Sequence, residues 1–520
     1  MAALAGALVG AACVIAYDRN VAAQKKIRAE YGGWRKLNLV LQSVEENYVD
    51  TVDCAKVSEA AIVAALSALD PHTIYMEPTH LKDAEDDLAG NFDGIGIQFN
   101  VPNDTAIVLE VIPGGPSEKI GLQPGDRILQ VDDKVIAGVK FPQDSMVRRM
   151  KGPAGTKVLI TVGRGGERIP FEITRGKIPT HSVDASFMVS DTVGYLRLSK
   201  FARTTYEEVT KACSELTGAG MKHLIIDLRG NSGGFFDQSL LMANMFLPRG
   251  AGIVYMDGLH RKLQEYDADG RGKLQETGVS VLIDDGSASS SEIFAGAIQD
   301  NDRGTIVGRR SFGKGLVQEP VYFSDGSGVR ITVARFYTPS GRCIQKPYSG
   351  DYNYEIYERY GTGEMSSADS MKVDRSVEYH TVGGRVVYGG GGIIPDVFVP
   401  VDTTRVSPFY VACNKKATAM RFASAYFDAH KAELSAISDY DSLLKYLDSS
   451  SLESRFLDFA RRRDSLECDP EAWKSEKSYM MTQVRALVGR YSKLGDKAFY
   501  HLYLQIDDIY DAAMENLTAR

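Results

Sequence analysis

A glycine-rich string in the middle of the chain carries a serine of the kind that acts as a nucleophile. Gly230–Gly234 reads GNSGG, which fits the GxSxG pattern that presents a serine between a strand and a helix. Such a hydrolase also needs an aspartate and a histidine, and none of the later histidines stands in a recognisable partner setting (His260, His380, His430 and His501). The alternative is a turn whose backbone N–H groups stabilise an anion. We favour the turn and keep an esterase at Ser232 as a second hypothesis.

A second string, Gly308–Gly315, reads GRRSFGKG and comes close to a phosphate-binding P-loop. A P-loop has Ser or Thr after its lysine to hold magnesium, whereas Gly315 follows Lys314 here. The next residues predict a strand, although phosphate binding requires the N-terminus of a helix. These departures exclude a nucleotide-binding enzyme and leave Lys314 as a cation between two glycines in an otherwise apolar stretch.

The third string is the serine cluster Ser287–Ser291, between a strand predicted at 279–285 and a helix predicted at 291–301. A serine at such a junction can project its hydroxyl from the turn, and neighbouring N–H groups can face a developing oxyanion. A serine cluster there is equally typical of a helix N-cap. Both interpretations hold if one serine caps the helix and another is exposed.

The elements that position these strings belong to a multidomain α/β protein. The 520 residues suggest three or four domains, and 44% hydrophobic with 25% charged residues is ordinary globular composition. A formal net charge of −8 without a long basic run argues against nucleic acid as a partner. Six scattered cysteines without a CxxC pair, and eight histidines without HExxH, predict no metal centre. We expect no cofactor.

Periodicity and turn residues divide the chain into five parts. Strands alternating with helices predict an α/β core with largely parallel strands, and short strand-like runs separated by glycine and proline predict an inserted β-rich domain. Helical spacing predicts the flanking regions, where Ser450 and Glu453 have the form of a capping box. The parts are 1–17 (apolar signal or anchor), 18–83 (helices), 84–177 (β-rich domain), 178–405 (α/β core) and 406–520 (helices).

The β-rich region resembles a PDZ domain. Its string GLQPGDRILQV makes a tight turn into a strand at Pro124–Asp126. In that family the loop before the second strand holds a peptide carboxylate with backbone N–H groups, and the resemblance places Gly94, Ile95, Gly96 and Ile97 there. Alternating glycines let the backbone approach an anion, and the next strand edge can accept a peptide as an added strand. The resemblance implies binding of protein C-termini without chemistry.

The α/β core resembles the carboxyl-terminal processing peptidases, also called tail-specific proteases. The string IDDGSASSSEIFAGAIQDNDRGTIVGRRSFGKGLVQ is similar to the catalytic segment of that family. YLRLSKF and IIDLRGNSGGFFDQS upstream, and ARFYTPSGRCIQ and GGIIPDVFV downstream, fit the family in order and spacing. With the PDZ-like region and LDPHTIYM before it, the likeness covers about residues 36–400 and excludes the helices after 405.

This resemblance implies a serine–lysine dyad. The nucleophile of the family lies in the SASxSE string and the base in FGKG, which are Ser289 and Lys314 here, and Gln318 in the next strand braces the lysine. A solvated lysine has a pKa of ~10.4, whereas a general base must be neutral. Burial favours the neutral amine. The apolar neighbours expected to supply that burial are Phe312, Leu316 and Val317.

The resemblance also implies oxyanion donors, which are the N–H of Ser290 and the N–H of a glycine in the turn, Gly233 or Gly234. Asp300 matches a family position and is expected to be structural. One departure is the serine at position 290, where the family more often has alanine. Family register alone therefore selects Ser289 over its serine neighbours.

Together these features predict a serine endopeptidase that recognises protein tails through its PDZ domain and cuts peptide bonds through an acyl-enzyme. The alternatives are an inactive peptidase fold that serves as a PDZ scaffold, and the esterase at Ser232. Expected partners are proteins or peptides with exposed C-termini. Family likeness adds self-association through the helices before residue 70 or after residue 405.

The uncharged run Ala2–Tyr17 predicts export. A membrane span needs about 17–25 residues, so the run is borderline for an anchor. It also lacks the Lys or Arg that normally precedes the apolar part of a signal peptide. The alternative is a buried, alanine-rich helix. We expect a protein of the bacterial periplasm or cell envelope, anchored in the inner membrane by this segment.

Overall fold

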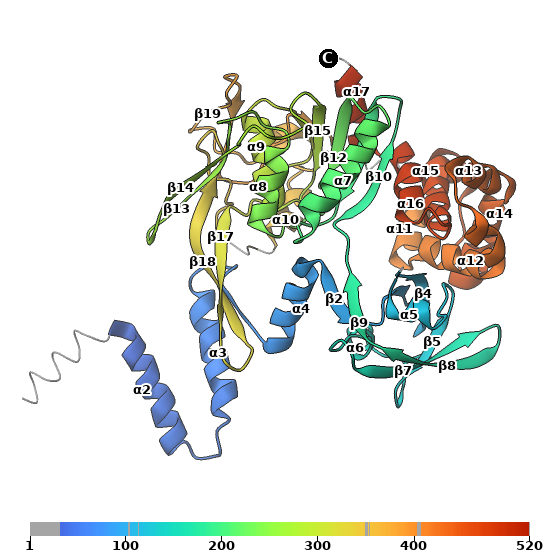
Figure 1. Cartoon of the computed structure of the whole chain (residues 1–520), viewed down its shortest axis with the longest axis horizontal. Coiled ribbons are helices and arrows are strands. Elements are labelled where there is room, and N and C mark those ends of the chain that lie inside the picture. The colour runs from blue at the N-terminus through green and yellow to red at the C-terminus, as the bar shows by residue number, and fades with distance from the viewer. Residues whose placement is uncertain are drawn as a thin grey trace, which may run out of the picture. The chain divides into compact units, whose positions relative to one another are not determined.

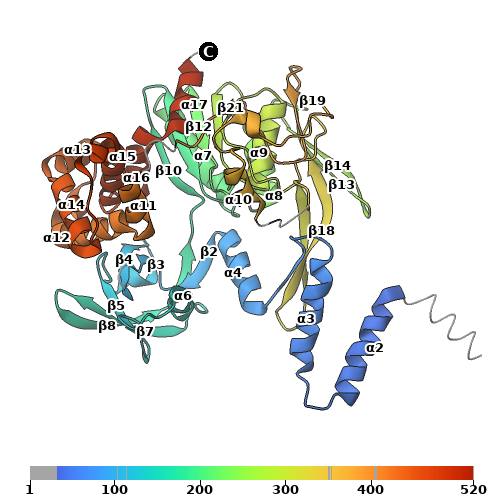
Figure 2. The ribbon, with the colours of Figure 1, turned by 180° about the vertical axis from the view of Figure 1, so that it is seen from behind.

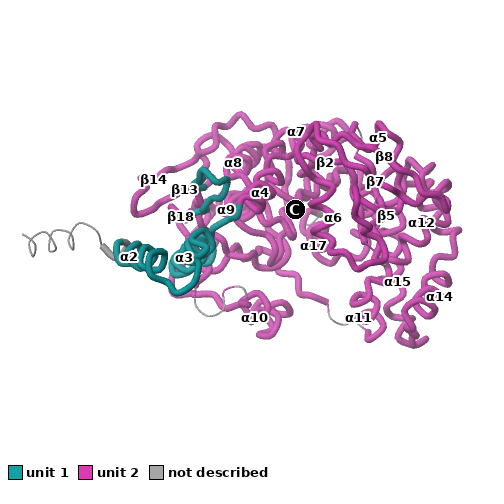
Figure 3. The backbone as a smooth tube through the Cα atoms, turned by 90° about the horizontal axis from the view of Figure 1, so that it is seen from below, with its two compact units in different colours: residues 1–77, 320–331 teal, residues 78–319, 332–520 magenta. Residues whose placement is uncertain are grey.

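The computed structural model describes residues 32–518, apart from 102–103, 113, 349–351, 353 and 403–406. The chain forms two compact units, one of residues 1–77 and 320–331 and the other of 78–319 and 332–520 (Figure 3). The apolar run Ala2–Tyr17 lies outside the described residues. No helix in the described part combines the length and the apolar character that a membrane crossing demands.

In its described residues, from 32 onward, the smaller unit has two helices and a short strand pairing. α2 (Gly32–Asn47) is followed by α3 (Cys54–Ser67), which Asp53 caps by accepting a hydrogen bond from the N–H of Lys56 at 3.1 Å. The strand β1 (Ile74–Met76) pairs antiparallel with the first residues of β18 (Gly328–Tyr337). No side chain of α3 is buried, although its sequence is largely apolar.

A six-stranded antiparallel sheet forms the centre of the β-rich region. Its order is β3-β4-β5-β7-β8 with β6 beside β5, and β2 pairs separately with β9. Met146 and Met150 of α6 pack with Val108 and Ile160 of the sheet, so the region has its own core. The elements are α4 (Pro78–Ala89), β2 (Asn91–Gly94), β3 (Ile97–Asn100), β4 (Ala106–Val111), α5 (Pro116–Lys119), β5 (Arg127–Val131), β6 (Lys134–Val135), α6 (Gln143–Met150), β7 (Lys157–Arg164), β8 (Glu167–Thr174) and β9 (Gly176–Pro179).

The α/β core is built on a second six-stranded sheet, of order β10-β11-β12-β15-β16-β21. Neighbouring strands are parallel except β10 and β11, which confirms the predicted largely parallel core. The strands are β10 (Val183–Met188), β11 (Val193–Leu198), β12 (His223–Asp227), β15 (Gly278–Ile283), β16 (Thr305–Gly308) and β21 (Val397–Phe398).

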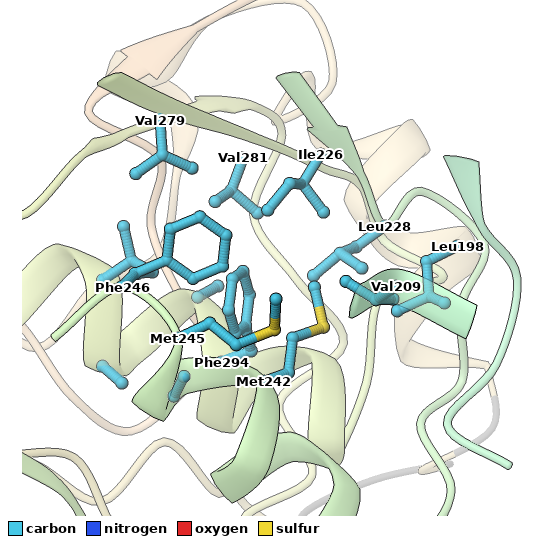
Figure 4. Packing of buried hydrophobic residues seen from close by; sticks show 14 of the residues in the cluster. Leu198, Val209, Ile226, Leu228, Met242, Met245, Phe246, Val279, Val281 and Phe294 are labelled. Carbon is cyan, nitrogen blue, oxygen red and sulfur yellow. The ribbon is translucent and has the colours of Figure 1, made fainter. Parts of the chain in front are cut away.

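Helices cover both faces of this sheet because alternate residues of each strand point to opposite sides. On one face, Ile226 and Val281 pack with Met242 and Phe294 from the helical layer (Figure 4). That layer comprises α7 (Thr205–Gly218), α8 (Phe236–Asn244) and α9 (Ser290–Asp300). On the other face, Ile225 and Leu282 share a buried cluster with Ile509 and Ala513 of α17 (Asp508–Thr518).

An antiparallel ladder and a looped segment complete the core. β13 (Gly252–Gly258) pairs with β14 (Arg261–Asp267) and with the second half of β18, where Tyr255 lies opposite Tyr337. β17 (Leu316–Tyr322) also pairs with β18 and confirms the strand predicted after the lysine string. The looped segment, residues 338–396 between β18 and β21, holds α10 (Glu355–Gly361), η2 (Ala368–Ser370), β19 (Tyr379–His380) and β20 (Val386–Val387).

The predicted C-terminal helical region forms a helical cluster with its own buried core (Figures 1 and 2). The capping box expected at Ser450 and Glu453 is wrong. Ser450 Oγ donates to the carbonyl of Leu447 at 2.7 Å, and the Glu453 carboxylate accepts a hydrogen bond from Trp473 Nε1 at 2.9 Å. An indole N–H among apolar side chains needs an acceptor, and this tertiary contact uses the carboxylate. The helices are α11 (Pro408–Lys415), α12 (Thr418–Ala436), α13 (Tyr440–Ser449), α14 (Leu452–Asp464), α15 (Pro470–Gly489) and α16 (Asp496–Tyr503).

Candidate active site

The serine loop, residues 284–290, joins β15 to α9 and holds Ser289 in an unusual backbone conformation. Ser289 is the N-cap residue of α9, with φ of +55° and ψ of −114°. Residues other than glycine rarely adopt such angles, which cost about 1–3 kcal/mol and persist where the surroundings enforce them. A strained serine at a strand-to-helix turn is the geometry that exposes a nucleophilic hydroxyl.

The neighbouring serines are buried and hydrogen-bonded. Ser287 Oγ donates to the carbonyl of Leu228 at 2.8 Å and Ser290 Oγ to that of Gly234 at 3.0 Å. Ser291 Oγ does the same with the carbonyl of Asn231 at 2.8 Å, and none of the three side chains is more than 1% exposed. Ser289 is partly exposed. It is therefore the serine of this cluster that a substrate reaches most easily.

The lysine loop, residues 311–315, is the last part of the connection from β16 to β17 and has no regular structure. Lys314 is partly buried, and its Nζ donates to Oε1 of Gln318 on β17 at 2.9 Å. Ser311, Gly313 and Leu316 around it are buried. The amine that sequence motifs select as a base is thus directed by an amide oxygen four residues further on.

One buried carboxylate joins the two loops, and sequence reasoning did not assign it. Glu292 is 0% exposed and accepts hydrogen bonds from the N–H of Ser289 at 2.9 Å and of Lys314 at 2.8 Å. It also accepts from the N–H of Gly313 at 2.8 Å and from Ser311 Oγ at 2.5 Å. Burial raises the pKa of the Glu292 carboxyl, and these hydrogen bonds oppose the rise. A glutamate three residues after the N-cap was the available sequence signal.

The GNSGG turn lies directly against the serine loop. A Cβ on Gly233 would lie 2.8 Å from Ser289 Cβ and 2.9 Å from the nitrogen of Ser290, and φ there is +101°. The N–H of Gly233 donates to Asn231 Oδ1 at 2.9 Å. In the described part of the chain, no hydrogen bond uses the N–H of Gly234 or that of Ser290. Among the expected oxyanion donors, the N–H of Gly233 thus has an acceptor within the chain, and those of Gly234 and Ser290 have none in its described part.

Ser232 and Asp300 take different places. Ser232 is exposed, and its side chain makes no hydrogen bond within the described residues. Asp300 is fully buried and accepts hydrogen bonds from Arg342 Nη2 at 2.6 Å and from the N–H of Ser340 at 3.0 Å. Asp300 therefore joins α9 to the segment after β18.

Arg229 ties the start of the turn to the C-terminal helices. Its guanidinium donates to Asp227 at 2.6 Å and to Asp507 at 2.8 Å, just before α17. Burial alone would raise the pKa of Asp227, but Arg229 and Arg197 hold it well below the usual range. The end of β12 is thus fixed by buried charge pairs.

In the β-rich region, the four residues expected to bind a carboxylate form the link between β2 and β3. Gly94 ends β2, Ile95 is 2% exposed, and Ile97 begins β3, which is an edge strand of its sheet. Gly96 has φ of +78°, and a Cβ there would meet Ile178 Cδ1 at 3.0 Å. An edge strand after a glycine loop is the arrangement that strand addition of a peptide requires.

Comparison with known proteins decides the family. The chain matches Peptidase family S41 over residues 192–353 and the PDZ domain over residues 94–174. It is 31% identical over 331 residues to the carboxy-terminal processing protease CtpA of Bacillus subtilis, covering 63% of this chain and 70% of the relative. The carboxy-terminal-processing protease of Bartonella bacilliformis is 36% identical over 312 residues, with 59% and 71% covered. The chain belongs to the carboxy-terminal processing proteases.

A solved structure of the photosystem II D1 C-terminal processing protease is 28% identical to this protease, with a TM-score of 0.36, and the match covers 70% of this chain and 88% of that one. The sites described above fall within the family matches. Ser289, Lys314, Gln318 and Glu292 lie inside the S41 range, and Gly94–Ile97 lies inside the PDZ range. The helices after residue 407 lie outside both ranges. Within the described residues, no group of three or more His, Cys, Asp or Glu side chains is arranged to hold a metal ion.

Proposed function

We propose that this protease cleaves peptide bonds with a Ser289–Lys314 dyad. The observation that carries the proposal is the carboxylate of Glu292, which accepts hydrogen bonds from the N–H of Ser289 and of Lys314 and so links their loops. The strained, partly exposed position of Ser289 supports its role as nucleophile. The hydrogen bond from Lys314 Nζ to Gln318 supports a base whose direction is set by its neighbour.

In this scheme the reaction begins with proton transfer. The neutral amine of Lys314 accepts the proton of Ser289 Oγ, and Oγ forms a bond to the carbonyl carbon of the substrate. The carbonyl electron pair moves onto oxygen, and the oxyanion accepts hydrogen bonds from the N–H groups of Gly234 and Ser290. The C–N bond then breaks, the Lys314 ammonium gives its proton to the leaving amine, and an ester with Ser289 remains.

Water completes the cycle. Neutral Lys314 takes a proton from a water molecule as its oxygen attacks the ester carbonyl. Collapse of the second tetrahedral intermediate breaks the bond to Ser289 Oγ, which takes the proton back from Lys314. Every proton is then returned and the acid product leaves. The scheme uses side chains and backbone of this chain alone.

The test is degradation of a reporter with an unstructured C-terminal tail, combined with mass-spectrometric mapping of a fluorophosphonate adduct. We expect wild type to degrade the reporter, Ser289→Ala to leave it intact, and the adduct to lie on the peptide that contains Ser289. An adduct on Ser232 instead, lost in Ser232→Ala, would support the esterase. Absence of both degradation and adduct in the folded wild-type protein would support the scaffold.

The PDZ-like region is proposed to capture the C-terminal tail of a substrate at Gly94, Ile95, Gly96 and Ile97. The edge strand β3 and the left-handed backbone at Gly96 support this. Gly96→Val strains that backbone and pushes against Ile178, so it should weaken degradation of tailed substrates about tenfold while a short unstructured peptide is cut nearly as before. Equal loss on both substrates would place the loop in the catalytic assembly. Equal retention would remove the capture hypothesis.

Export is proposed from the run Ala2–Tyr17. Fractionation of the native bacterium should find the protease in the membrane or periplasmic fraction, with its domains outside the cytosol. Recovery of the full-length protein from the cytosol would remove this proposal and leave the peptidase assignment untouched.

Self-association is proposed through the N-terminal helices rather than through the helices after residue 405. α3 is largely apolar and has no buried side chain, with Val63 51% exposed and Val57 37% exposed, so a second copy of the chain would cover apolar surface. Light scattering should give a multiple of the monomer mass for wild type and the monomer mass for Val57→Glu/Val63→Glu. A wild-type monomer would refute this proposal.

A further inference from the structure

Helix α10 approaches the lysine loop with a buried arginine. Arg359 is 2% exposed, and its guanidinium donates from Nη1 to the carbonyl of Ser311 at 2.8 Å and from Nη2 to that of Phe312 at 3.1 Å. Its Nε donates to Glu355 at 2.8 Å, which fixes the direction of the guanidinium. Both carbonyls lie just before Lys314 in the chain. Arg359 therefore holds the backbone from which the Lys314 amine extends.

The lysine loop depends on partners from other segments because it has no ladder or helix of its own. Gly313 has φ of +91°, which only glycine adopts easily. The N–H groups of Gly313 and Lys314 donate to Glu292, and the carbonyl of Gly313 accepts from the N–H of Lys346 at 2.9 Å. Glu292 thus holds two N–H groups of the loop and Arg359 holds two of its carbonyls. Other groups of the loop bind backbone outside it, as the N–H of Phe312 does when it donates to the carbonyl of Ser287 at 2.9 Å.

Arg359 is itself held in a network whose cations are buried and whose shared carboxylate, Glu355, is partly exposed and also lies 3.6 Å from Arg310. Glu355 also accepts a hydrogen bond from Lys346 at 3.0 Å, and Arg310 makes two contacts of 2.6 Å with Glu364. The Lys346 ammonium lies 4.1 Å from the ring centre of Phe312. Removal of one partner from such a network leaves a buried charge uncompensated, which is strongly destabilising. Each cation therefore stays beside its carboxylate.

An arginine suits this position better than a lysine. The planar guanidinium carries five N–H donors in a fixed fork and can serve two carbonyls and one carboxylate at once. A lysine ammonium is a compact charge on a flexible stem and cannot reproduce that geometry. The three partners of Arg359 match the fork, since Nε binds Glu355 while Nη1 and Nη2 bind adjacent carbonyls.

We propose that Arg359 is a positioning residue of the proteolytic reaction, which sets the place of the Lys314 amine by holding the carbonyls of Ser311 and Phe312. The inference rests on the proposed role of Lys314 as the base. A displaced amine slows proton transfer without changing substrate capture, and a misplacement of about 1 Å can cost about 100-fold in rate. The proposal therefore predicts a loss in kcat with an unchanged KM.

The experiment compares Arg359→Ala and Arg359→Lys with wild type on a tailed reporter. In parallel it measures how fast a fluorophosphonate labels Ser289, a reaction that needs the base but not the tail. We expect the kcat and the labelling rate of Arg359→Ala to fall together by about 10- to 100-fold, with KM changed less than about twofold. Guanidinium at millimolar concentration should restore part of the rate, whereas equal NaCl should not. Arg359→Lys should lose about 3- to 10-fold, because it serves fewer acceptors.

Arg303→Ala is the matched control. Arg303 also donates to backbone carbonyls, those of Phe246, Leu274 and Thr277, but these lie outside the lysine and serine loops. This variant should lower the midpoint of thermal unfolding and leave kcat and the labelling rate per folded molecule unchanged. The same pattern in Arg359→Ala would show a merely structural role and overturn the inference.

Two further outcomes are decisive. A loss in Arg359→Ala confined to KM overturns the inference, since capture and not the base is then affected. If Arg359→Ala does not fold, Arg359→Lys decides, and a wild-type kcat and labelling rate in that variant overturn the inference. Activity retained by both Ser289→Ala and Lys314→Ala would instead refute the proposed function, which keeps the two failures distinguishable.

Discussion

The serine loop and the lysine loop are held in different ways. Ser289 stands between β15 and α9, and its neighbours Ser287 and Ser290 donate to the carbonyl of Leu228, just after β12, and to that of Gly234 in the GNSGG turn. Lys314 stands on a loop without regular structure, whose N–H and carbonyl groups are bound by Glu292 and Arg359. Ser289 is thus held by the strand and helix that flank it and by the GNSGG turn that lies against it. The loop of Lys314 has no flanking helix and depends on distant side chains as well as on backbone contacts, so substitutions far along the chain should disturb it more.

The largest effect is expected from the base itself. Lys314→Arg should be as inactive as Lys314→Ala and Ser289→Ala, with turnover reduced at least about 1,000-fold, because residues that act as a unit lose activity together. A guanidinium stays protonated at any useful pH and cannot accept the serine proton. Reporter degradation measures this, with Ser232→Ala as the active control. Substantial activity in Lys314→Arg, or inactivity of Ser232→Ala, would end the dyad assignment.

The link between the loops should come next. Glu292→Gln keeps the size of the side chain but replaces one acceptor oxygen with an NH₂ group that faces N–H donors. We expect kcat to fall about 100-fold and the free energy of unfolding to drop by about 1–3 kcal/mol. Steady-state kinetics and denaturant unfolding test this. A variant with wild-type kcat would mean that the loops do not need their shared carboxylate.

The Glu292 carboxylate should make folding stability and catalytic activity depend on pH in opposite directions. Because the pKa of Glu292 is raised on folding, the folded chain binds that proton more tightly than the unfolded chain. Its contribution to stability is therefore greatest below about pH 4.3 and is lost as pH rises through the folded pKa. Activity should instead rise as pH increases, because protonation of Glu292 removes an acceptor for the N–H groups of the two loops. Glu292→Gln should lack both changes, and an unaltered acid limb of its activity would contradict the assignment.

A smaller effect is expected from the orienting amide. Gln318→Ala removes the acceptor of the Lys314 Nζ hydrogen bond and leaves the amine on its loop. Partial activity should remain, reduced about 2- to 12-fold, because one neutral hydrogen bond is worth about 0.5–1.5 kcal/mol. Gln318→Glu is the informative companion, since a carboxylate favours the protonated amine. In Gln318→Glu, the midpoint of the rise of activity with pH should therefore lie at a higher pH than in wild type.

The smallest effect is expected on the serine side. Ser290→Ala removes the hydroxyl bound to the carbonyl of Gly234 but keeps the N–H that the mechanism uses. Activity should stay within about twofold and stability should fall by about 1 kcal/mol. We expect the same small changes in activity and stability for Ser287→Ala. A large loss of kcat in Ser290→Ala would show that the serine loop is less self-supporting than the comparison implies.

The sequence predicted what is local and missed what is distant. Alternating strands and helices predicted the parallel core, and glycine and serine strings placed Ser289 at a strand-to-helix junction and Lys314 before a strand. The contact of Glu292 with Gly313 and Lys314 depends on how two strands and a helix pack, which spacing alone does not encode. The predicted capping box at Ser450 was wrong for a similar reason, since Glu453 accepts a hydrogen bond from the distant Trp473 instead.

The buried position of Arg359 could not be predicted from the sequence, for a different reason. It lies in the looped segment between two family motifs, on a helix of seven residues with tyrosines around it and no apolar period to mark a buried face. Its burial follows from charges contributed by Glu355 and from two carbonyl groups, and backbone carbonyls carry no signature in a sequence. Polar contacts to backbone are therefore the part of this site that requires the folded chain.

The packing of α17 against the parallel sheet has a consequence for synthesis. A ribosome makes Ser289 and Lys314 long before it makes α17, which packs against the sheet face that holds Ile225 and Leu282. Until then that face is open to water, and Arg229 beside the GNSGG turn has no Asp507 to pair with. The nascent chain then carries Ser289 and Lys314 on a sheet that α17 does not yet cover. Packing of this face of the sheet therefore waits until α17 has emerged from the ribosome.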